Sequence, residues 1–210
     1  MSLAEARLYL VSRAVIGGRS LVELVPELAA AGVDLLQLRE KEMEAGDILR
    51  VGGPLREACR EARVPFIVND RPDVALALDA DGVHLGQNDL PVDVARRIVG
   101  SAIVGVSTHT VADIDRVAGS VHPIEYIAVG PVTETPTKPG RPGVGFDLLR
   151  YAAGAAPVPW FAIGGMNSAT LPAAIEAGAR RAVIVRAVTE APDPVEAAAE
   201  LRALLDEVPL

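Results

Sequence analysis

The sequence predicts a single (β/α)₈ barrel, and three observations indicate this fold class. Short apolar runs alternate with helical segments along all 210 residues. The runs are rich in Val and Ile, which is typical of strands buried on both faces of a parallel sheet. A related phrase returns where a helix gives way to a strand, in AAGVDLL (30–36), LDADGVHL (78–85) and EAGARRAVIV (176–185). No change of composition marks a second domain, so we expect one domain over residues 1–210.

The expected strands follow one another at regular intervals. They lie at residues 7–11, 33–38, 65–69, 82–85, 102–107, 126–130, 159–164 and 182–186. The segments between them are rich in Ala, Leu, Glu and Arg at helical spacing. Ser20 and Asp193 are the predicted N-caps, and Gly32 and Gly178 the predicted C-terminal stops. Spread over eight units, 210 residues give about 26 per unit, fewer than in the usual barrel of roughly 250 residues.

A doubly wound open sheet is the main alternative fold. It normally has fewer strands and a G-x-G-x-x-G loop after the first one. The corresponding stretch here, LVSRAVIGGRS, offers Gly17 and Gly18 without that spacing. The barrel is therefore favoured.

The composition excludes several classes of protein. Half of the residues are hydrophobic, which disfavours disorder, and no apolar run approaches the length of a membrane span. The net charge of −8 disfavours nucleic acid as a partner, and it means that any anionic substrate must be held by local groups. The single cysteine, Cys59, indicates an inert packed thiol and a reducing compartment, so we expect a cytoplasmic protein. The sequence leaves a homo-oligomer open.

Polar residues gather where the predicted strands end, which is where barrels carry their active sites. In QLREK, residues 37–41, the alternation of side chains directs Gln37, Arg39 and Lys41 to one side and Leu38 and Glu40 to the other. Other strands end in Asn69 and Asp70, in Ser107 and His109, in Gly164, Gly165 and Asn167, and in Arg186, while Asp89 follows the fourth strand. Each group alone is ordinary turn chemistry. Together, on six or seven strand ends, they indicate a site.

The residue types indicate chemistry on a phosphorylated substrate. Asp70 and Asp89 are suited to Mg²⁺, which takes one or two carboxylates together with phosphate oxygens. Arg39, Lys41 and Lys138 could surround a diphosphate. The Gly-Gly pair after the seventh strand exposes N–H groups to a phosphate. No Ser–His–acid order is present, so the set fits departure of a diphosphate better than covalent catalysis.

Residues 129–145, VGPVTETPTKPGRPGVG, follow the sixth strand. A linker, a disordered tether and a shaped binding loop are all compatible with so many Pro and Gly residues. Strands continue on both sides, which indicates a binding loop. Pro136 and Pro139 restrict its backbone, and Gly140 and Gly143 are expected to supply its turns.

These motifs, in this order, resemble those of the thiamine-phosphate synthase family. The resemblance extends over nearly the whole chain. It is carried by QLREK, by VNDRPDVALALDADGVHLGQNDLP, by GVSTH, by GPVTETPTKPGRPGVG and by FAIGGMN. It implies a TIM-barrel transferase that joins a pyrimidine diphosphate to a thiazole phosphate or its carboxylated form, by a dissociative mechanism assisted by Mg²⁺.

The resemblance also implies roles for individual residues. The pyrimidine diphosphate would be held by Gln37, Leu38, Arg39, Glu40, Lys41, Asn69, Ser107 and Lys138, of which Arg39, Lys41 and Lys138 are expected to be catalytic. The thiazole phosphate would be held by Thr135, Pro136, Thr137, Gly165, Val185 and Arg186. Asp70 and Asp89 would bind Mg²⁺.

Two departures from the family pattern stand out. Arg186 occupies a place where many members carry Ser, and YLVSRA lacks the acidic residue that often follows the first strand. Three rivals are weighed against the synthase. A thiazole tautomerase shares the barrel but needs no diphosphate site, and a non-catalytic phosphate-binding barrel would bind without turnover. A Schiff-base aldolase is disfavoured because neither lysine lies inside a strand.

Overall fold

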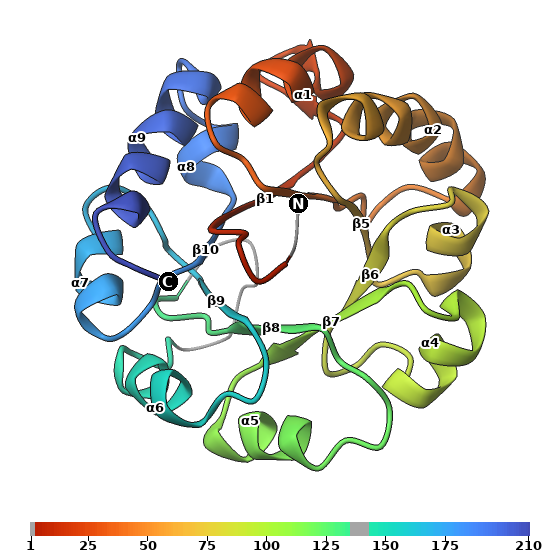
Figure 1. Cartoon of the computed structure of the whole chain (residues 1–210). Coiled ribbons are helices and arrows are strands. Elements are labelled where there is room, and N and C mark those ends of the chain that lie inside the picture. The colour runs from red at the N-terminus through yellow and green to blue at the C-terminus, as the bar shows by residue number, and fades with distance from the viewer. Residues whose placement is uncertain (1–2, 135–142) are drawn as a thin grey trace.

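The computed structural model describes residues 3–134 and 143–210, and these residues form a closed parallel barrel surrounded by helices (Figure 1). The strands follow the order β1-β4-β5-β6-β7-β8-β9-β10, and β10 pairs with β1. Their bounds are Leu8–Ser12 (β1), Leu35–Leu38 (β4), Phe66–Asn69 (β5), Gly82–Leu85 (β6), Ile103–Thr108 (β7), Tyr126–Val129 (β8), Trp160–Ile163 (β9) and Ala182–Ile184 (β10). The predicted fold and all eight predicted strands are confirmed.

Helices follow the strands, as expected for this fold. Their bounds are Leu21–Ala30 (α1), Ala45–Ala62 (α2), Pro72–Ala77 (α3), Val92–Val99 (α4), Val111–Ala118 (α5), Asp147–Ala155 (α6), Leu171–Glu176 (α7), Arg186–Thr189 (α8) and Pro194–Asp206 (α9). Asp193 caps α9 through its side chain, whereas Ser20 precedes α1 without a side-chain bond. Gly32 and Gly178 have φ of 99° and 101°, in agreement with their predicted role as stops. No helix within the described residues has the length and apolarity that crossing a bilayer requires.

A small hairpin between β1 and α1 was not predicted. Its strands are β2 (Val15–Ile16) and β3 (Arg19–Ser20). Gly17 and Gly18 form the two-residue turn, with φ of 55° and 83°. Positive φ at both positions is what a tight hairpin turn of this hand requires, and it explains the Gly-Gly pair.

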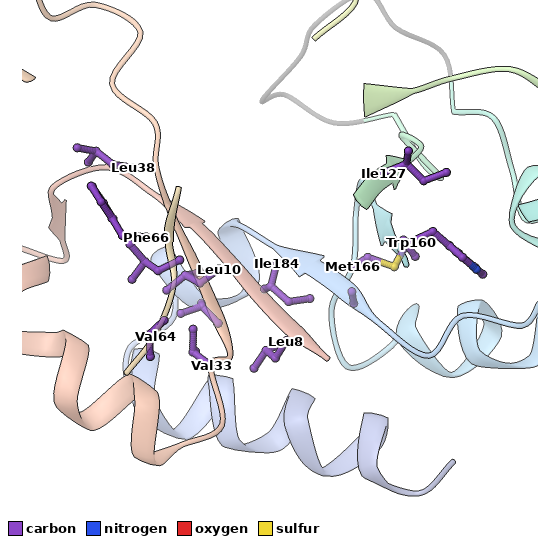
Figure 2. Close-up of a cluster of buried hydrophobic side chains, with 14 of the residues drawn as sticks. Leu8, Leu10, Val33, Leu38, Val64, Phe66, Ile127, Trp160, Met166 and Ile184 are labelled. Carbon is purple, nitrogen blue, oxygen red and sulfur yellow. The ribbon is translucent and has the colours of Figure 1, made fainter. Parts of the chain in front are cut away.

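Side chains of each strand alternate between two layers of core. On β1, Leu8 and Leu10 belong to the outer cluster between strands and helices, while Tyr9 and Val11 belong to the inner cluster inside the barrel. Figure 2 shows part of the outer cluster, with Leu8, Leu10 and Ile184 on the neighbouring strands β1 and β10. Burial on both faces explains why the strands read as continuous apolar runs.

Three aromatic rings fill the middle of the barrel. Tyr9, Tyr126 and Phe161 are fully buried and meet edge to face, with ring centroids 5.5–5.6 Å apart. Gly105 on β7 makes room for them, because a Cβ at that position would overlap the ring of Tyr126. The interior is therefore a packed core rather than a pore.

An acidic residue directly precedes three alternate strands, β4, β6 and β8, at the N-terminal edge of the barrel and accepts hydrogen bonds from the neighbouring strand. Asp34, before β4, accepts hydrogen bonds from the backbone N–H groups of Arg7 (2.6 Å) and Leu8 (3.0 Å). It also forms an ion pair with Arg202 of α9, at 2.8 Å. One buried carboxylate thus links two strands and the last helix.

The same arrangement returns twice along the chain. Asp81, before β6, accepts from the N–H of Phe66 on β5 at 2.7 Å and pairs with Arg56 of α2 at 3.3 Å. Glu125, before β8, accepts from the N–H of Val104 on β7 at 2.7 Å and pairs with Arg96 of α4 at 2.8 Å. We call these three arrangements the acid clasps.

We expect Asp34→Ala to lower the free energy of unfolding by about 3 kcal/mol, because it leaves Arg202 without its buried partner and two N–H groups without an acceptor. Urea unfolding followed by circular dichroism measures the change. Asp93→Ala, at an exposed ion pair on α4, is the matched control and should cost less than about 1 kcal/mol. Equal losses in both variants would contradict the clasp.

We expect Gly105→Ala to lower the free energy of unfolding by about 1–3 kcal/mol, since the added methyl group displaces Tyr126 from a filled interior. Gly53→Ala is the control. Gly53 lies in α2, and a Cβ added there would have no other atom within 4 Å. That variant should gain about 0.5–1 kcal/mol from the reduced entropy of the unfolded chain. The same urea titration checks both, and a stable Gly105→Ala would show that the interior is loosely packed.

Candidate active site

Three hollows meet at the carboxyl ends of the strands. The β9–β10 cavity, of about 290 Å³, is lined by Ser107, His109, Gly164, Gly165 and Arg186 among others. The β1–β4 cavity, of about 550 Å³, is lined by Arg13, Arg39, Lys41, Arg186 and Glu190 among others. The central cavity, of about 40 Å³, lies between them above Tyr9, His84 and Gln37. Val185 lines all three, so they form one composite site at the predicted end of the barrel.

The end of β4 separates its side chains as the alternation predicts. Arg39 lines the central and β1–β4 cavities, Lys41 lines the β1–β4 cavity, and Gln37 lies in the floor of the central one. Leu38 packs in the outer core, and Glu40 accepts a hydrogen bond from the N–H of Ala14 at 2.7 Å. The structure does not bring the side chains of Leu38 and Glu40 to any of the three cavities. Only their backbone atoms could contact the substrate for which they were predicted.

The two predicted metal ligands lie together, with a lysine beside them. Asp70 directly follows β5 with φ of 63°, a left-handed conformation that Asp tolerates better than most residues. Its Oδ2 lies 2.9 Å from Nζ of Lys41. Asp89 accepts a hydrogen bond from the N–H of Gly86 at 2.6 Å and lies within hydrogen-bonding reach of Asp70.

The charges around this pair act differently on its two members. Burial raises the pKa of Asp70, but hydrogen bonds with Lys41 and Asp89 outweigh burial and leave that pKa below its usual value. Burial and the neighbouring Asp70 both raise the pKa of Asp89. Asp70 thus disfavours the charged form of Asp89, and a divalent cation between the two carboxyl groups would stabilise both charges. The described residues contain no group of three or more metal-ligating side chains, and Mg²⁺ needs only one or two carboxylates when phosphate oxygens complete its shell.

A chain of buried hydrogen bonds forms the floor of the site. Gln37 Nε2 donates to the hydroxyl of Tyr9, which bonds to the hydroxyl of Tyr126 at 2.8 Å. That hydroxyl lies 3.0 Å from Nδ1 of His84, whose Nε2 lies 3.0 Å from Oγ of Ser107. His84 is thus a buried histidine whose two ring nitrogens both have hydrogen-bond partners. We call this chain of hydrogen bonds the relay. It holds Gln37 in the floor of the central cavity and Ser107 in the wall of the β9–β10 cavity.

Sequence reasoning missed the two tyrosines of this relay. Tyr9 and Tyr126 occur in apolar runs that identify them only as core. Burial raises the pKa of both phenols, so they remain neutral donors and acceptors. A tyrosine inside a predicted buried strand could have indicated such a hydrogen-bond chain, because a buried phenol hydroxyl needs a polar partner.

The first residues of the loop 129–145 pack against the end of β9. The N–H groups of Val132 and Thr133 donate to the carbonyls of Ile163 and Gly164 at 2.8 and 3.2 Å. Gly165 has φ of 74°, and a Cβ there would overlap the Thr133 hydroxyl. Glycine is therefore required where the β9 end, the loop base and the cavity meet.

The predicted turn glycines need one correction. Gly145, with φ of 71°, takes the left-handed conformation that returns the chain toward α6. Gly143 instead permits a close approach, because a Cβ there would lie 2.6 Å from the carbonyl oxygen of Val132. Composition alone does not distinguish these two uses of glycine. The predicted residues Thr135, Pro136, Thr137 and Lys138, together with Gly140, lie outside the described residues.

The remaining predicted residues lie at the site. Asn69 lines the central cavity, and Val185 precedes α8, whose first residue is Arg186. The expected strand 182–186 thus ends at Ile184. Arg13 and Glu190 also line the site and were not predicted. Cys59 is buried among apolar side chains away from the site, and burial raises the pKa of its thiol to about 12, as expected for an inert packed cysteine.

Comparisons with known proteins show which family the chain belongs to. The sequence profile of a family described as thiamine monophosphate synthase matches residues 8–188. A thiamine-phosphate synthase from Acidothermus cellulolyticus is 50% identical over 206 residues, which cover 97% of each chain. One from Thermobifida fusca is 47% identical over 202 residues, covering 95% of this chain and 92% of the relative.

Solved structures place the chain in the same group. A thiamine phosphate pyrophosphorylase from Pyrococcus furiosus superimposes with a TM-score of 0.87 at 30% identity, covering 98% of both chains. A 3-hexulose-6-phosphate synthase superimposes with a TM-score of 0.62 at 20% identity, covering 93% of this chain and 98% of the other, a likeness of fold alone. With a family profile that matches residues 8–188 and a relative that is 50% identical over nearly the whole chain, this chain belongs to the thiamine monophosphate synthase family.

Proposed function

We propose that this chain is a transferase that joins 4-amino-5-hydroxymethyl-2-methylpyrimidine diphosphate to 4-methyl-5-(2-phosphoethyl)thiazole. The products are thiamine phosphate and diphosphate. The observation that carries the proposal is the grouping of Arg39 and Lys41 with the carboxylate pair Asp70 and Asp89 beside one composite cavity. Relatives that share about half of this sequence over its full length bear the name of the synthase.

The reaction begins with cleavage of the bond between the pyrimidine CH₂ group and the diphosphate oxygen. The electron pair leaves with the diphosphate, and the thiazole nitrogen then supplies a pair to the pyrimidine carbocation. Negative charge grows on the leaving oxygen, and Arg39 and Lys41, which line the β1–β4 cavity, would stabilise it. No protein nucleophile takes part.

Asp70 and Asp89 would hold Mg²⁺, which supplies further positive charge to the diphosphate when bound. Lys41 already lies against Asp70, so this lysine stands between the carboxylates and the cavity. Its ammonium group can pass from the carboxylate to a diphosphate oxygen without leaving the site.

Two large cavities joined by a small one suit two phosphorylated substrates. The β9–β10 cavity, with Gly165 and Arg186, would hold the thiazole phosphate, and the β1–β4 cavity would hold the diphosphate. The central cavity, above Gln37 and Asn69, would then bring the reacting carbon and nitrogen together. The buried hydrogen-bond chain beneath it would hold Gln37 in place below the reacting atoms. With a single buried cysteine, we assign the reaction to the cytoplasm.

A tautomerase acting on the carboxylated thiazole is the closest rival. It would need neither the carboxylate pair nor the cations around the β1–β4 cavity. Both are present, which favours the synthase.

We expect the purified protein to form thiamine phosphate from the two precursors in the presence of Mg²⁺, and to stop when EDTA removes the metal. Chromatographic detection of thiamine phosphate, together with released diphosphate, measures the reaction. Isomerisation of the carboxylated thiazole without condensation would identify a tautomerase instead. Tight binding of the precursors without product would identify a non-catalytic barrel.

We expect Asp89→Asn to lower kcat by about 10²–10³-fold, because it removes one carboxylate from the Mg²⁺ site while its amide oxygen can still accept the Gly86 N–H. The Mg²⁺ concentration for half-maximal rate should rise. Asp93→Asn, on the exposed face of α4, should keep full activity. Unchanged Mg²⁺ dependence in Asp89→Asn would remove Asp89 from the metal site.

A further inference from the structure

One of the cationic residues that line the β1–β4 cavity has not yet been given a role. Arg39, Lys41 and Arg186 line it, and so does Arg13, to which no role has been given. Glu42 and Glu190 are the acidic residues among those that line it, so four cations face two acids. In a chain of net charge −8 this local excess indicates a site built for an anion.

Strand register brings Arg13 beside Arg39. Val11 pairs with Gln37 and Ser12 with Leu38 along the β1–β4 ladder. The N–H of Arg39 donates to the carbonyl of Ser12 at 2.8 Å, so the pairing continues one step beyond the strands. Val11 and Gln37 both line the central cavity, and Arg13 and Arg39 follow each of them by two residues. With a period of two, both side chains leave their strands on the same side, and both arginines line the β1–β4 cavity.

Within the part of the chain that the structure describes, neither guanidinium group forms an ion pair or donates a hydrogen bond to a carbonyl. Nearly all other described arginines form an ion pair or donate to a carbonyl, as Arg19, Arg186 and Arg180 illustrate. Among residues 3–134 and 143–210, only Arg13, Arg39 and Arg63 have neither kind of contact. Arg63 lies exposed at the end of α2, far along the sequence from either strand end. The other two converge on one cavity.

The electrostatics of Arg39 agree with this geometry. Burial lowers the pKa of its guanidinium group, Asp70 opposes that effect, and the positive charge of Arg13 lowers the pKa further. Two guanidinium groups that repel each other across a cavity are stabilised when an anion lies between them. Guanidinium groups also bind phosphate through two parallel hydrogen bonds.

We propose that Arg13 is a further substrate-binding residue that grips the diphosphate together with Arg39. This inference rests on the proposed function, because it takes the diphosphate to occupy the β1–β4 cavity. Lys41 forms an ion pair with Asp70, whereas within residues 3–134 and 143–210 neither Arg13 nor Arg39 forms one. Among the described residues that line the cavity, Arg13 thereby adds a cation from the end of β1 to those that follow β4 and that begin α8.

The test compares Arg13→Gln with Arg13→Lys, using Arg63→Gln as the matched control for loss of an unpaired arginine. Inorganic diphosphate with Mg²⁺ is the calorimetric probe, and steady-state synthesis gives KM for each precursor. We expect Arg13→Gln to weaken diphosphate binding and to raise KM for the pyrimidine diphosphate, each by about 10-fold. KM for the thiazole phosphate should stay unchanged. Arg13→Lys should recover part of the loss, and Arg63→Gln should match the wild type.

Wild-type diphosphate affinity and KM in Arg13→Gln would overturn the inference, and so would a rise confined to KM for the thiazole phosphate. Circular dichroism and the unfolding midpoint verify that the variant is folded. If the wild-type protein makes no thiamine phosphate, the proposed function fails. The calorimetric comparison still decides whether Arg13 binds diphosphate, so the two failures are distinguishable.

Discussion

Closing eight strands into a barrel leaves an interior that only inward-facing side chains can fill, and the rest of the site depends on how this chain fills it. Tyr9, Tyr126 and Phe161 supply the volume. Because a buried hydroxyl needs a partner, the two tyrosines extend a line of hydrogen bonds to Gln37 at one side and His84 at the other. Packing the core thus also builds the floor on which the substrates rest.

The charged groups at the two edges of the barrel serve different purposes. Acids that precede β4, β6 and β8 face backbone N–H groups and arginines at the N-terminal edge. Cations gather at the opposite edge, around the β1–β4 cavity. A chain with an overall negative charge can in this way hold anionic substrates, since nearby groups at short distance outweigh remote charges screened by solvent.

Much of this organisation could be predicted because it depends on local sequence. Apolar runs located all eight strands, and polar strand ends located the site, since the ends of parallel strands meet at one edge. Contacts between distant residues were beyond such reasoning. The Tyr9–Tyr126 bond spans 117 positions, and the neighbourhood of Arg13 and Arg39 follows from a register that no single segment encodes. Likewise, the sequence does not show that Gly143 is needed for a close contact with the Val132 backbone and Gly145 for a positive φ.

The acid clasps have a consequence for how the chain assembles. The bonds of Asp81 to Phe66 and of Glu125 to Val104 join residues 15 and 21 positions apart, so they can form early while the chain is still growing. The Asp34–Arg202 pair spans 168 positions and joins the second strand of the barrel to its final helix. Contacts of such separation require closing a long loop. The ring of strands closes through β10 and β1, and the clasp at Asp34 is complete only once α9 has been synthesised.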